Sequence, residues 1–377
     1  MEGSKVEFFI AGGNGFIGSN LVANLLRRYP DSGVYNLDLY ENRELLRMMD
    51  VEDQKERYTF VEGNVMDPDT YEDYLKLSDV VITCAFENNR ELFQEKMHRF
   101  INTNILGSRI LADVTGRYEI PMIMISTDEV YGSCPETIPR RDENAPMMPT
   151  NPYATTMAAA ESLCSQSRKM YNSPLVILRP CMLVGPNQGK RRLIPGTIKS
   201  VMDGKPPKVM GKRDKHYRDW LHVYDLCSAV DLVIKGMTGR GLTHDSPAKV
   251  GMDGHNMTVI SGTEVATVPP KKMDKKTSPE QLIAGGAVSF NVTGEMRYPI
   301  YTIVELILKE MGSELPIQEK EHSIYRDIGY NPSGRKLSYQ GWSPKYNEID
   351  GILRSTIEWY REHPEALEMV STGQLKP

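Results

Sequence analysis

The chain has 377 residues, of which 40% are hydrophobic and 25% charged, so it is long enough for two domains and too apolar for a disordered or fibrous protein. Its formal net charge of -5 comes without any concentration of basic residues, which argues against a nucleic-acid partner. The five cysteines are far apart, and no apolar run reaches the length of about 18 residues that a membrane span needs. We therefore expect a cytoplasmic protein with reduced thiols and no membrane contact.

Short apolar runs alternate with longer helix-prone segments in the first half of the chain. The runs that we interpret as strands are 6–11, 33–39, 58–62, 80–84, 121–125 and 175–178. The segments that we interpret as helices are 16–26, 41–57, 98–118 and 153–171. Continuous apolar runs are typical of parallel strands that are buried on both faces. The pattern predicts an α/β fold, a Rossmann-type doubly wound parallel sheet, with a first domain over residues 1–179.

The character of the chain changes after Pro180, where glycine and proline break it into short pieces. We expect a smaller α/β lobe over 180–377, which closes with an amphipathic helix at 349–360. Some segments of this lobe are expected to return to the large sheet, and 238–288 is expected to form a loop-rich insertion. A basic run at 269–276 within the insertion is more typical of a solvated loop than of a binding patch.

A glycine-rich turn separates the first predicted strand from the first predicted helix. Its sequence is GGNGFIG, and the residues that we assign to the cofactor there are Gly12, Gly15, Phe16, Ile17 and Gly18. Glycine permits a tight turn and close helix packing, and the N-terminus of the helix favours a pyrophosphate. Asp38 ends the second strand, where a carboxylate accepts both adenosine ribose hydroxyls and repels a 2′-phosphate. The pattern predicts NAD rather than NADP, and Arg43 is expected to be a surface charge.

A second polar cluster follows the strand at 121–125. Thr127, Asp128 and Glu129 lie just past the carboxyl end of that strand, where open parallel sheets bind ligands, and Tyr153 opens an alanine-rich helix. On its own, this polar run is also typical of a helix cap. At these residues the chain resembles the extended short-chain dehydrogenases/reductases, and within them the nucleotide-sugar 4,6-dehydratase family. The resemblance covers nearly the whole chain, and the adjacent Asp and Glu are its most specific part.

The resemblance implies a reaction on a nucleotide-diphosphate sugar with NAD as cofactor. The hexose would be oxidised at C4, water would be eliminated across C5 and C6, and the hydride would return to C6. Glu129 would take the C5 proton and Asp128 would protonate the departing C6 hydroxyl. Tyr153, with Thr127, would take the proton of the C4 hydroxyl. Neighbouring carboxyls in a partly dry pocket favour one ionised and one protonated group, as this chemistry requires.

The chain departs from the family one turn after Tyr153. The family has a lysine there, which binds the nicotinamide ribose and lowers the tyrosine pKa, whereas this chain has Met157. A thioether donates no hydrogen bond and carries no charge, so Tyr153 is expected to be a poorer base at neutral pH. Three interpretations are open: an introduced replacement of lysine that traps a complex, a native enzyme that uses another cation or a relayed water, or NAD binding without efficient turnover.

Further contacts are implied by the resemblance alone. On the cofactor side they are Asn64, Val65, Ala85 and Asn104. On the substrate side they are Glu87, Asn88, Thr127, Arg192, Leu193, Arg218 and Asn291. Asn64 replaces the aspartate that usually meets the adenine, and an amide can accept from the adenine amino group as well. Met182 and the neighbours of Glu87 also differ from the family, which leaves the sugar and the base open.

Two of these substrate residues have alternative interpretations. Arg218 would bind the diphosphate, for which its fork of donors is suited. The alternative is a surface ion pair of Arg218 with Asp219 or Asp214. For Asn291, the alternative to a nucleotide contact is an amide that caps a loop.

The predicted function is an NAD-dependent nucleotide-sugar 4,6-dehydratase, a hydro-lyase. One alternative is another nucleotide-sugar enzyme of the same fold, such as a 5,6-dehydratase, an epimerase or a decarboxylase. The other is a catalytically impaired protein that binds NAD and a sugar nucleotide. We assign no metal, because His216 and His222 have no second ligand at metal spacing. The resemblance also implies a homodimer that packs through the helices at 98–118 and 153–171.

Overall fold

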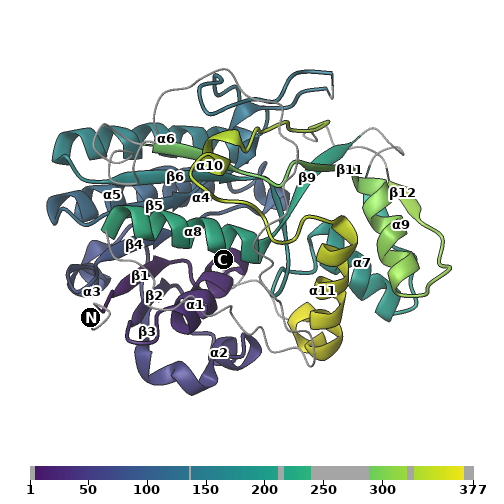
Figure 1. Cartoon of the computed structure of the whole chain (residues 1–377), viewed down its shortest axis with the longest axis horizontal. Helices are drawn as coiled ribbons and strands as arrows, with labels where there is room; N and C mark the ends of the chain where they lie inside the picture. The colour runs from purple at the N-terminus through teal and green to yellow at the C-terminus, as the bar shows by residue number, and fades with distance from the viewer. Residues whose placement is uncertain (1–4, 136, 211–215, 239–287, 321–326, 369–377) are drawn as a thin grey trace.

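The computed structural model describes residues 5–135, 137–210, 216–238, 288–320 and 327–368. The insertion predicted at 238–288, with its basic run, lies almost wholly outside these ranges, and Asp214 lies outside them too. A large layered unit and a smaller unit lie side by side (Figure 1). Within the described ranges, no helix is both long and apolar enough to cross a membrane.

A parallel sheet of seven strands forms the centre of the large unit, in the order β10-β6-β5-β4-β1-β2-β3. The strands are β1 (Phe8–Ala11), β2 (Val34–Asp38), β3 (Tyr58–Glu62), β4 (Val80–Thr83), β5 (Met122–Ile125), β6 (Leu175–Pro180) and β10 (Val288–Val292). Every neighbouring pair is parallel. This is the doubly wound, Rossmann-type sheet that the sequence predicts, and each of the predicted strands is present.

Helices cover both faces of this sheet (Figure 1). They are α1 (Phe16–Arg28) and α8 (Val223–Thr238) on one face, and α5 (Ser108–Arg117) and α6 (Pro152–Tyr171) on the other, with the short α3 (Glu72–Lys76) nearby. Along β1, Phe8 and Ile10 belong to the apolar cluster of α1 and α8, whereas Phe9 and Ala11 belong to that of α5 and α6. Successive side chains of a strand point to opposite faces, so a continuous apolar run is buried on both sides.

The smaller unit contains two further sheets, one in the order β11-β9-β7 and one that pairs β12 with β8. Its strands are β7 (Met182–Val184), β8 (Lys208–Met210), β9 (Tyr217–His222), β11 (Met296–Pro299) and β12 (Gln318–Lys320). The short α10 (Arg335–Ser338) contacts β10 of the large sheet. The helices that follow Pro180 in the smaller unit are α7 (Leu193–Met202), α9 (Ile300–Glu310) and α11 (Ile349–Glu362). The last of these confirms the helix predicted at 349–360. Both β10 and α8 follow Pro180 in the chain but belong to the large unit.

The helix-prone segment at 41–57 does not form one helix, so that prediction was wrong. It contains only α2 (Leu45–Met48) and a 3₁₀ segment at Glu52–Arg57. Asp50 has a left-handed backbone conformation, with a φ of 55°, between the two pieces. A residue in this conformation ends a helix and redirects the chain.

The helix predicted at 98–118 is present but irregular. It runs from α4 (Met97–Phe100) into α5, and its middle part, η4 (Ile101–Gly107), is π-helical. Such segments are rare and frequently occur at functional sites. This one contains Asn104, which the sequence assigned to the cofactor side.

Candidate active site

The glycine-rich turn joins β1 to α1 at the carboxyl edge of the sheet. Gly12 has a left-handed φ of 85°, and a Cβ there would lie 2.8 Å from the backbone of Ala85. A Cβ on Gly18 would lie 2.1 Å from the carbonyl oxygen of Gly12, so α1 packs directly on the turn. The first amides of α1, at Phe16 and Ile17, have no carbonyl one turn earlier in the helix. The turn therefore offers amide donors and a helix N-terminus to an anion.

Asp38 ends β2 beside this turn. Its carboxylate accepts hydrogen bonds from the amides of Asn14, at 3.0 Å, and Leu39, at 2.8 Å. Burial raises the pKa of Asp38, and these two amides oppose the shift. A carboxylate held by two amides keeps lone pairs for ribose hydroxyls, so this position fits an adenosine dinucleotide. Arg43 instead pairs with the exposed Glu41 at 2.9 Å, as expected for a surface charge.

Two more predicted cofactor residues have mainly local partners. Gly15 is the N-cap of α1, and its amide donates to the carbonyl of Gly12 at 3.2 Å. The Oδ1 atom of Asn64 accepts the amide of Met66 at 3.0 Å, which shapes the loop after β3. The side-chain amide hydrogens of Asn64 are the groups that this contact leaves for a ligand.

Asn104 is fully buried and fastens the loop that follows β4. Its Oδ1 accepts the amide of Glu87 at 2.7 Å, and its Nδ2 donates to the carbonyl of Glu87 at 3.0 Å and to Thr156 Oγ1 at 2.9 Å. Both amide hydrogens are therefore used within the protein. Val65 is buried beside η4, where a Cβ on Gly107 would lie 2.5 Å from it.

The predicted catalytic residues follow β5 in a buried 3₁₀ turn, η5 (Asp128–Tyr131). Thr127 caps the turn, because its hydroxyl accepts the amide of Glu129 at 3.2 Å. Asn151 caps α6 in a similar way, and its Nδ2 donates to Glu129 Oε2 at 2.8 Å. The strand end and the first turn of α6, which carries Tyr153, thus meet at one carboxylate.

Glu129 accepts hydrogen bonds from three side chains. The Nη2 atom of Arg90 lies 2.9 Å from both carboxylate oxygens, and the Tyr330 hydroxyl lies 3.0 Å from Oε2. Asn151 is the third donor. Sequence reasoning missed all three as site residues. Only Asn151 had a local signal, since an asparagine that precedes proline is typical of a helix start.

The surroundings of the two adjacent carboxyls shift their pKa values in opposite directions. Asp128 and Glu129 are 4% and 7% exposed. Burial, and then the charge of Glu129, raises the pKa of Asp128 well above its usual value, although Arg218 opposes this. Burial also acts to raise the pKa of Glu129, but Arg90 and Arg218 outweigh it and the pKa lies below its usual value. The surroundings therefore favour a proton on Asp128 over a proton on Glu129.

Tyr153 lies in the first turn of α6 and is half-buried. Burial raises its pKa, and the charge of Glu129 adds to this, whereas Arg192 and Arg90 lower it. Met157, one turn later, is fully buried in the apolar cluster between α6 and the sheet. The positive charges that act on Tyr153 therefore come from outside α6.

The predicted substrate residues differ in their burial and in their contacts. Glu87 is buried and pairs with Arg99 at 3.2 Å, whereas Asn88 is exposed. Arg192 is the N-cap of α7, and Leu193 begins that helix. Both are half-buried.

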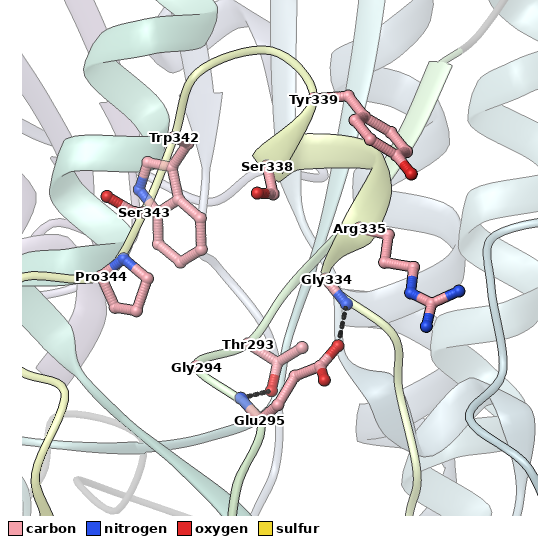
Figure 2. A pocket seen from close by; sticks show the side chains of 10 residues that line it. All are labelled: Thr293, Gly294, Glu295, Gly334, Arg335, Ser338, Tyr339, Trp342, Ser343 and Pro344. Carbon is pink, nitrogen blue, oxygen red and sulfur yellow. Dashed lines mark hydrogen bonds between the residues drawn. The ribbon is translucent and has the colours of Figure 1, made fainter. Parts of the chain in front are cut away.

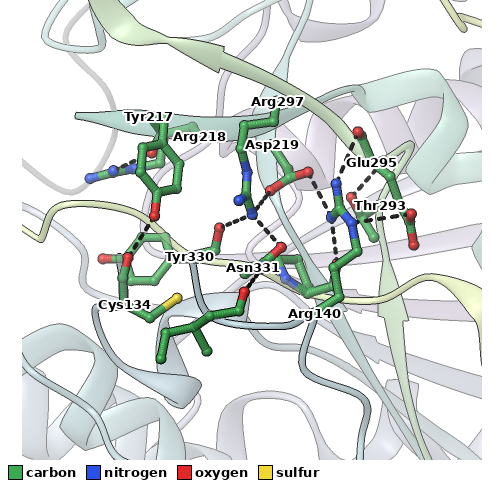
Figure 3. A network of polar contacts seen from close by, with 12 residues as sticks. Cys134, Arg140, Tyr217, Arg218, Asp219, Thr293, Glu295, Arg297, Tyr330 and Asn331 are labelled. Atoms are coloured by element: carbon green, nitrogen blue, oxygen red, sulfur yellow. Dashed lines mark hydrogen bonds and ion pairs between the residues drawn. The ribbon is translucent and has the colours of Figure 1, made fainter. Parts of the chain in front are cut away.

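Arg218 is only 4% exposed and binds backbone carbonyls. It donates to the carbonyl oxygen of Tyr217 at 2.7 Å and to that of Asp327 at 3.2 Å. The alternative of an ion pair with Asp219 is not supported. That carboxylate binds Arg140 at 3.0 Å and Arg297 at 3.2 Å instead (Figure 3).

Asn291 is fully buried in β10. Its Oδ1 accepts the Tyr131 hydroxyl at 2.8 Å, and its Nδ2 donates to the carbonyls of Arg141, at 3.1 Å, and Ser333, at 3.2 Å. A side-chain amide has two hydrogens, and both are engaged here. This arrangement corresponds to the capping amide rather than to a free nucleotide contact.

A cavity of about 370 Å³ lies elsewhere, between the β10–β11 turn and α10 (Figure 2). Its lining residues are Thr293, Gly294, Glu295, Gly334, Arg335, Ser338, Tyr339, Trp342, Ser343 and Pro344. None of the residues that the sequence assigned to cofactor or substrate is among them. The candidate active site therefore lies at the carboxyl edge of the large sheet, not in this cavity.

Comparison with known proteins identifies relatives over nearly the whole chain. The NAD dependent epimerase/dehydratase family matches residues 8–241. A dTDP-glucose 4,6-dehydratase of Streptomyces niveus is 28% identical over 366 residues, which are 95% of this chain and 94% of that protein. The crystal structure of a dTDP-glucose 4,6-dehydratase from Bacillus anthracis, in complex with NAD, is 25% identical with a TM-score of 0.75 and covers 96% of this chain and 99% of that one. A UDP-N-acetylglucosamine 4-epimerase from Methanobrevibacter ruminantium shares the fold, with 21% identity, a TM-score of 0.74 and coverage of 96% and 99%.

The family match spans the glycine-rich turn, Asp38, the carboxyl pair at Asp128 and Glu129, and Tyr153. The family is NAD-dependent, which confirms the cofactor predicted from Asp38. The site is thus built from residues of the matched region, together with Tyr330 and Asp327 from beyond it. The chain belongs to the NAD-dependent epimerase/dehydratase family, and within it resembles the nucleotide-sugar 4,6-dehydratases.

Proposed function

We propose that this chain is an NAD-dependent nucleotide-sugar 4,6-dehydratase, which converts a glucose nucleotide of the dTDP or UDP type to a 4-keto-6-deoxy sugar. The observation that carries the proposal is the opposite setting of Asp128 and Glu129. Elimination of water beside a ketone needs one group that accepts the C5 proton and another that donates to the leaving C6 hydroxyl. Hydride transfer alone needs neither, so the paired carboxyls favour a dehydratase over an epimerase.

The cofactor is proposed to lie along the carboxyl edge of the sheet. The first amides of α1 hold its pyrophosphate, and Asp38 accepts its ribose hydroxyls. Gly12 and Gly15 keep the cradle free of side chains, since a Cβ on Gly15 would meet only the carbonyl oxygen of Gly12, at 3.4 Å. When bound, NAD supplies the hydride acceptor for C4 and the hydride donor for C6.

Each catalytic side chain has one proton task in this proposal. Glu129, held ionised by Arg90, takes the C5 proton. Asp128, buried and protonated, gives its proton to the C6 hydroxyl so that water leaves. Thr127 and Tyr153 hold the C4 hydroxyl, and Tyr153 takes its proton.

We propose that Arg192 and Arg90 supply the positive charge that the family lysine supplies elsewhere. Both act to lower the pKa of Tyr153, although burial and the charge of Glu129 leave it above its usual value, and neither arginine belongs to α6. Met157 lies in an apolar cluster, where it fills space but contributes no charge. Among the three interpretations of Met157, this arrangement supports a native enzyme that uses another cation.

The substrate is proposed to lie between the carboxyl pair and α7. Arg192 occupies the N-cap position of α7, so a cationic residue lies at a helix N-terminus, which suits a diphosphate. Leu193 and the loop that carries Glu87 and Asn88 are proposed to border the sugar. We propose no nucleotide contact for Asn291, because both hydrogens of its side-chain amide are engaged within the protein, and we assign Arg218 chiefly to holding the turn at Asp327.

A homodimer is the proposed assembly. Ile101 and Leu106 of η4 are 46% and 47% exposed, and Met170, near the end of α6, is 64% exposed. η4 and α6 pack against each other, so these apolar side chains belong to neighbouring helices. Burial of such side chains against a second copy is the favourable term in association. We also propose a cytoplasmic location, since the five cysteines are free.

The test is incubation with dTDP-glucose and with UDP-glucose, followed by mass spectrometry and the alkaline absorbance of a 4-keto-6-deoxy sugar. The expected product is lighter than its substrate by one water. An epimerase would give a product of unchanged mass, and a decarboxylase would release carbon dioxide from a uronic acid. A protein that retains NAD and binds the sugar nucleotide without any product would contradict the proposal.

A further inference from the structure

A second carboxyl group lies next to Glu129 and comes from the smaller unit. Asp327 is 5% exposed. Asn151 Nδ2 donates to Glu129 Oε2 and to Asp327 Oδ2, both at 2.8 Å. The Tyr330 hydroxyl lies 3.0 Å from the same Glu129 oxygen and also contacts Asp327 Oδ2. We call the carboxyl groups of Glu129 and Asp327, which the Tyr330 hydroxyl joins, the bridged carboxyl pair.

The number of hydrogens in the bridged carboxyl pair is informative. The amide of Asn151 has two hydrogens, so it can satisfy both carboxylates at once. The hydroxyl of Tyr330 has only one hydrogen but contacts an oxygen on each side, so both contacts are hydrogen bonds only when one carboxyl carries a proton. Both contacts of the Tyr330 hydroxyl are therefore hydrogen bonds when the two carboxyl groups together carry one proton.

The turn that carries Asp327 and Tyr330 is fixed from two sides. Thr150 Oγ1 donates to Asp327 Oδ1 at 2.6 Å, and Arg218 donates to the backbone carbonyl of Asp327 at 3.2 Å. The guanidinium of Arg218 also lies 4.8 Å from the centre of the Tyr330 ring, and Figure 3 shows the two residues together. The second carboxyl is thus held in place and is not a loose surface group.

Within the described residues, charged and titratable groups surround the bridged carboxyl pair. They are Arg90 from the loop after β4, Asp128 from η5, Tyr153 from α6, Arg192 from α7, and Arg218 and Asp219 from β9, with His216 at the backbone of Asp327. The arginines favour the ionised form of Glu129. The charge of Asp327 acts in the opposite direction, since a neighbouring anion increases the affinity of Glu129 for a proton.

We propose that Tyr330 and Asp327 are positioning residues for Glu129, and that the proton which Glu129 takes up is shared with Asp327 across Tyr330. This inference rests on the proposed dehydratase function. The C5–H bond breaks, its electron pair stays on the carbon beside the ketone, and the proton goes to the Glu129 carboxylate. Glu129 then donates to the Tyr330 oxygen, while the Tyr330 hydrogen is donated to Asp327. No oxidant or further reactant is needed in this step.

The experiment is a double-mutant cycle on the titration of Glu129, measured without substrate. The carboxyl stretch of Glu129 is followed by infrared difference spectroscopy against pH and assigned by its loss in Glu129→Gln. Asp327→Asn removes the second charge, so the midpoint is expected to fall by about one pH unit. In a chain that also carries Tyr330→Phe, Asp327→Asn is expected to lower the Glu129 midpoint by less than half as much, because the bridging hydroxyl is absent.

Tyr217→Phe provides the matched tyrosine control, since that hydroxyl donates to the backbone carbonyl of Cys134. In the Tyr217→Phe chain, Asp327→Asn is expected to lower the Glu129 midpoint by the full amount. An unshifted midpoint, or an equal shift with and without Tyr330, would overturn the inference. If Asp327→Asn does not fold, as judged by its melting temperature, Asp327→Ser removes the same carboxylate.

The titration also separates this inference from the proposed function. If the midpoints follow the cycle and no sugar product forms, the bridged carboxyl pair stands and the dehydratase proposal fails. If a 4-keto-6-deoxy product forms but the midpoints do not follow the cycle, only the sharing of the proton fails. In an active enzyme, the acid limb of the kcat/KM profile is expected to move with the midpoint.

Discussion

One guanidinium nitrogen of Arg90 lies 2.9 Å from both carboxylate oxygens of Glu129, although the residues are 39 positions apart in the chain. This contact keeps Glu129 ionised in a buried site, where a lone carboxylate would instead gain a proton. The neighbouring Asp128 has no such ion pair with Arg90 and is raised in pKa. Arg90 therefore distinguishes the two carboxyls that the sequence places side by side.

Replacement of Arg90 by glutamine is expected to raise the pKa of Glu129, because the main opposing charge is removed. The acid limb of the kcat/KM profile is expected to move to higher pH by about one unit. Arg191→Gln is the matched control, since Arg191 pairs with the exposed Glu91 at 3.2 Å. An acid limb that stays in place in Arg90→Gln would contradict the role given to this arginine.

Glu129→Gln is expected to stop elimination while leaving the oxidation at C4 possible. The loss of a general base lowers a rate by about a hundredfold to ten-thousandfold. Absorbance of reduced cofactor is expected to persist after sugar nucleotide is added, without product of lower mass. Product formation at the original rate would remove Glu129 from the proposed mechanism, and Glu91→Gln serves as an exposed control.

Arg192→Met is expected to slow cofactor reduction at neutral pH, because the pKa of Tyr153 rises when this charge is lost. The acid limb of the pH profile for C4 oxidation, which reports the ionisation of the base Tyr153, is expected to move to higher pH, and Arg191→Met is expected to leave it unchanged. Met157→Lys complements this test. A large gain in cofactor reduction by Met157→Lys would show that the arginines do not replace the family lysine.

Asp128→Asn is expected to stabilise the fold at neutral and alkaline pH while it abolishes dehydration. The folded pKa of Asp128 lies above the ordinary value of 3.8, so the folded state holds a proton that the unfolded state has lost. Between those two pKa values, stability falls as pH rises, and the asparagine variant lacks this loss. Melting temperatures across this pH range are the measurement. A variant that melts below the native chain at every pH would contradict the sign.

Leu106→Asp is expected to convert the proposed dimer into a monomer, since it puts a charge into an apolar contact. Leu77 is the matched control, because it is 61% exposed and follows α3 rather than η4 or α6. Light scattering coupled to gel filtration gives the mass of each variant. A native chain that is already monomeric would refute the assembly.

The sequence by itself determined the features whose physical causes are local. Continuous apolar runs can be buried on both faces only in a covered parallel sheet, and the turn at Gly12 needs a conformation that glycine adopts freely. Asp38, Glu129 and Tyr153 could be assigned because each lies at a strand end or a helix start, where side chains reach the carboxyl edge. The same local reasoning failed at 41–57, where a left-handed residue interrupts the helix.

Only the tertiary structure decided which charges meet. Tyr330 is 201 residues from Glu129, and no periodicity connects positions that far apart. The sequence could not show that Asn291 uses all its amide hydrogens within the protein, nor that arginines from two loops act on Tyr153. Proton affinities depend on burial and on charges a few ångströms away, and those distances are set by packing between the two units rather than by neighbours along the chain.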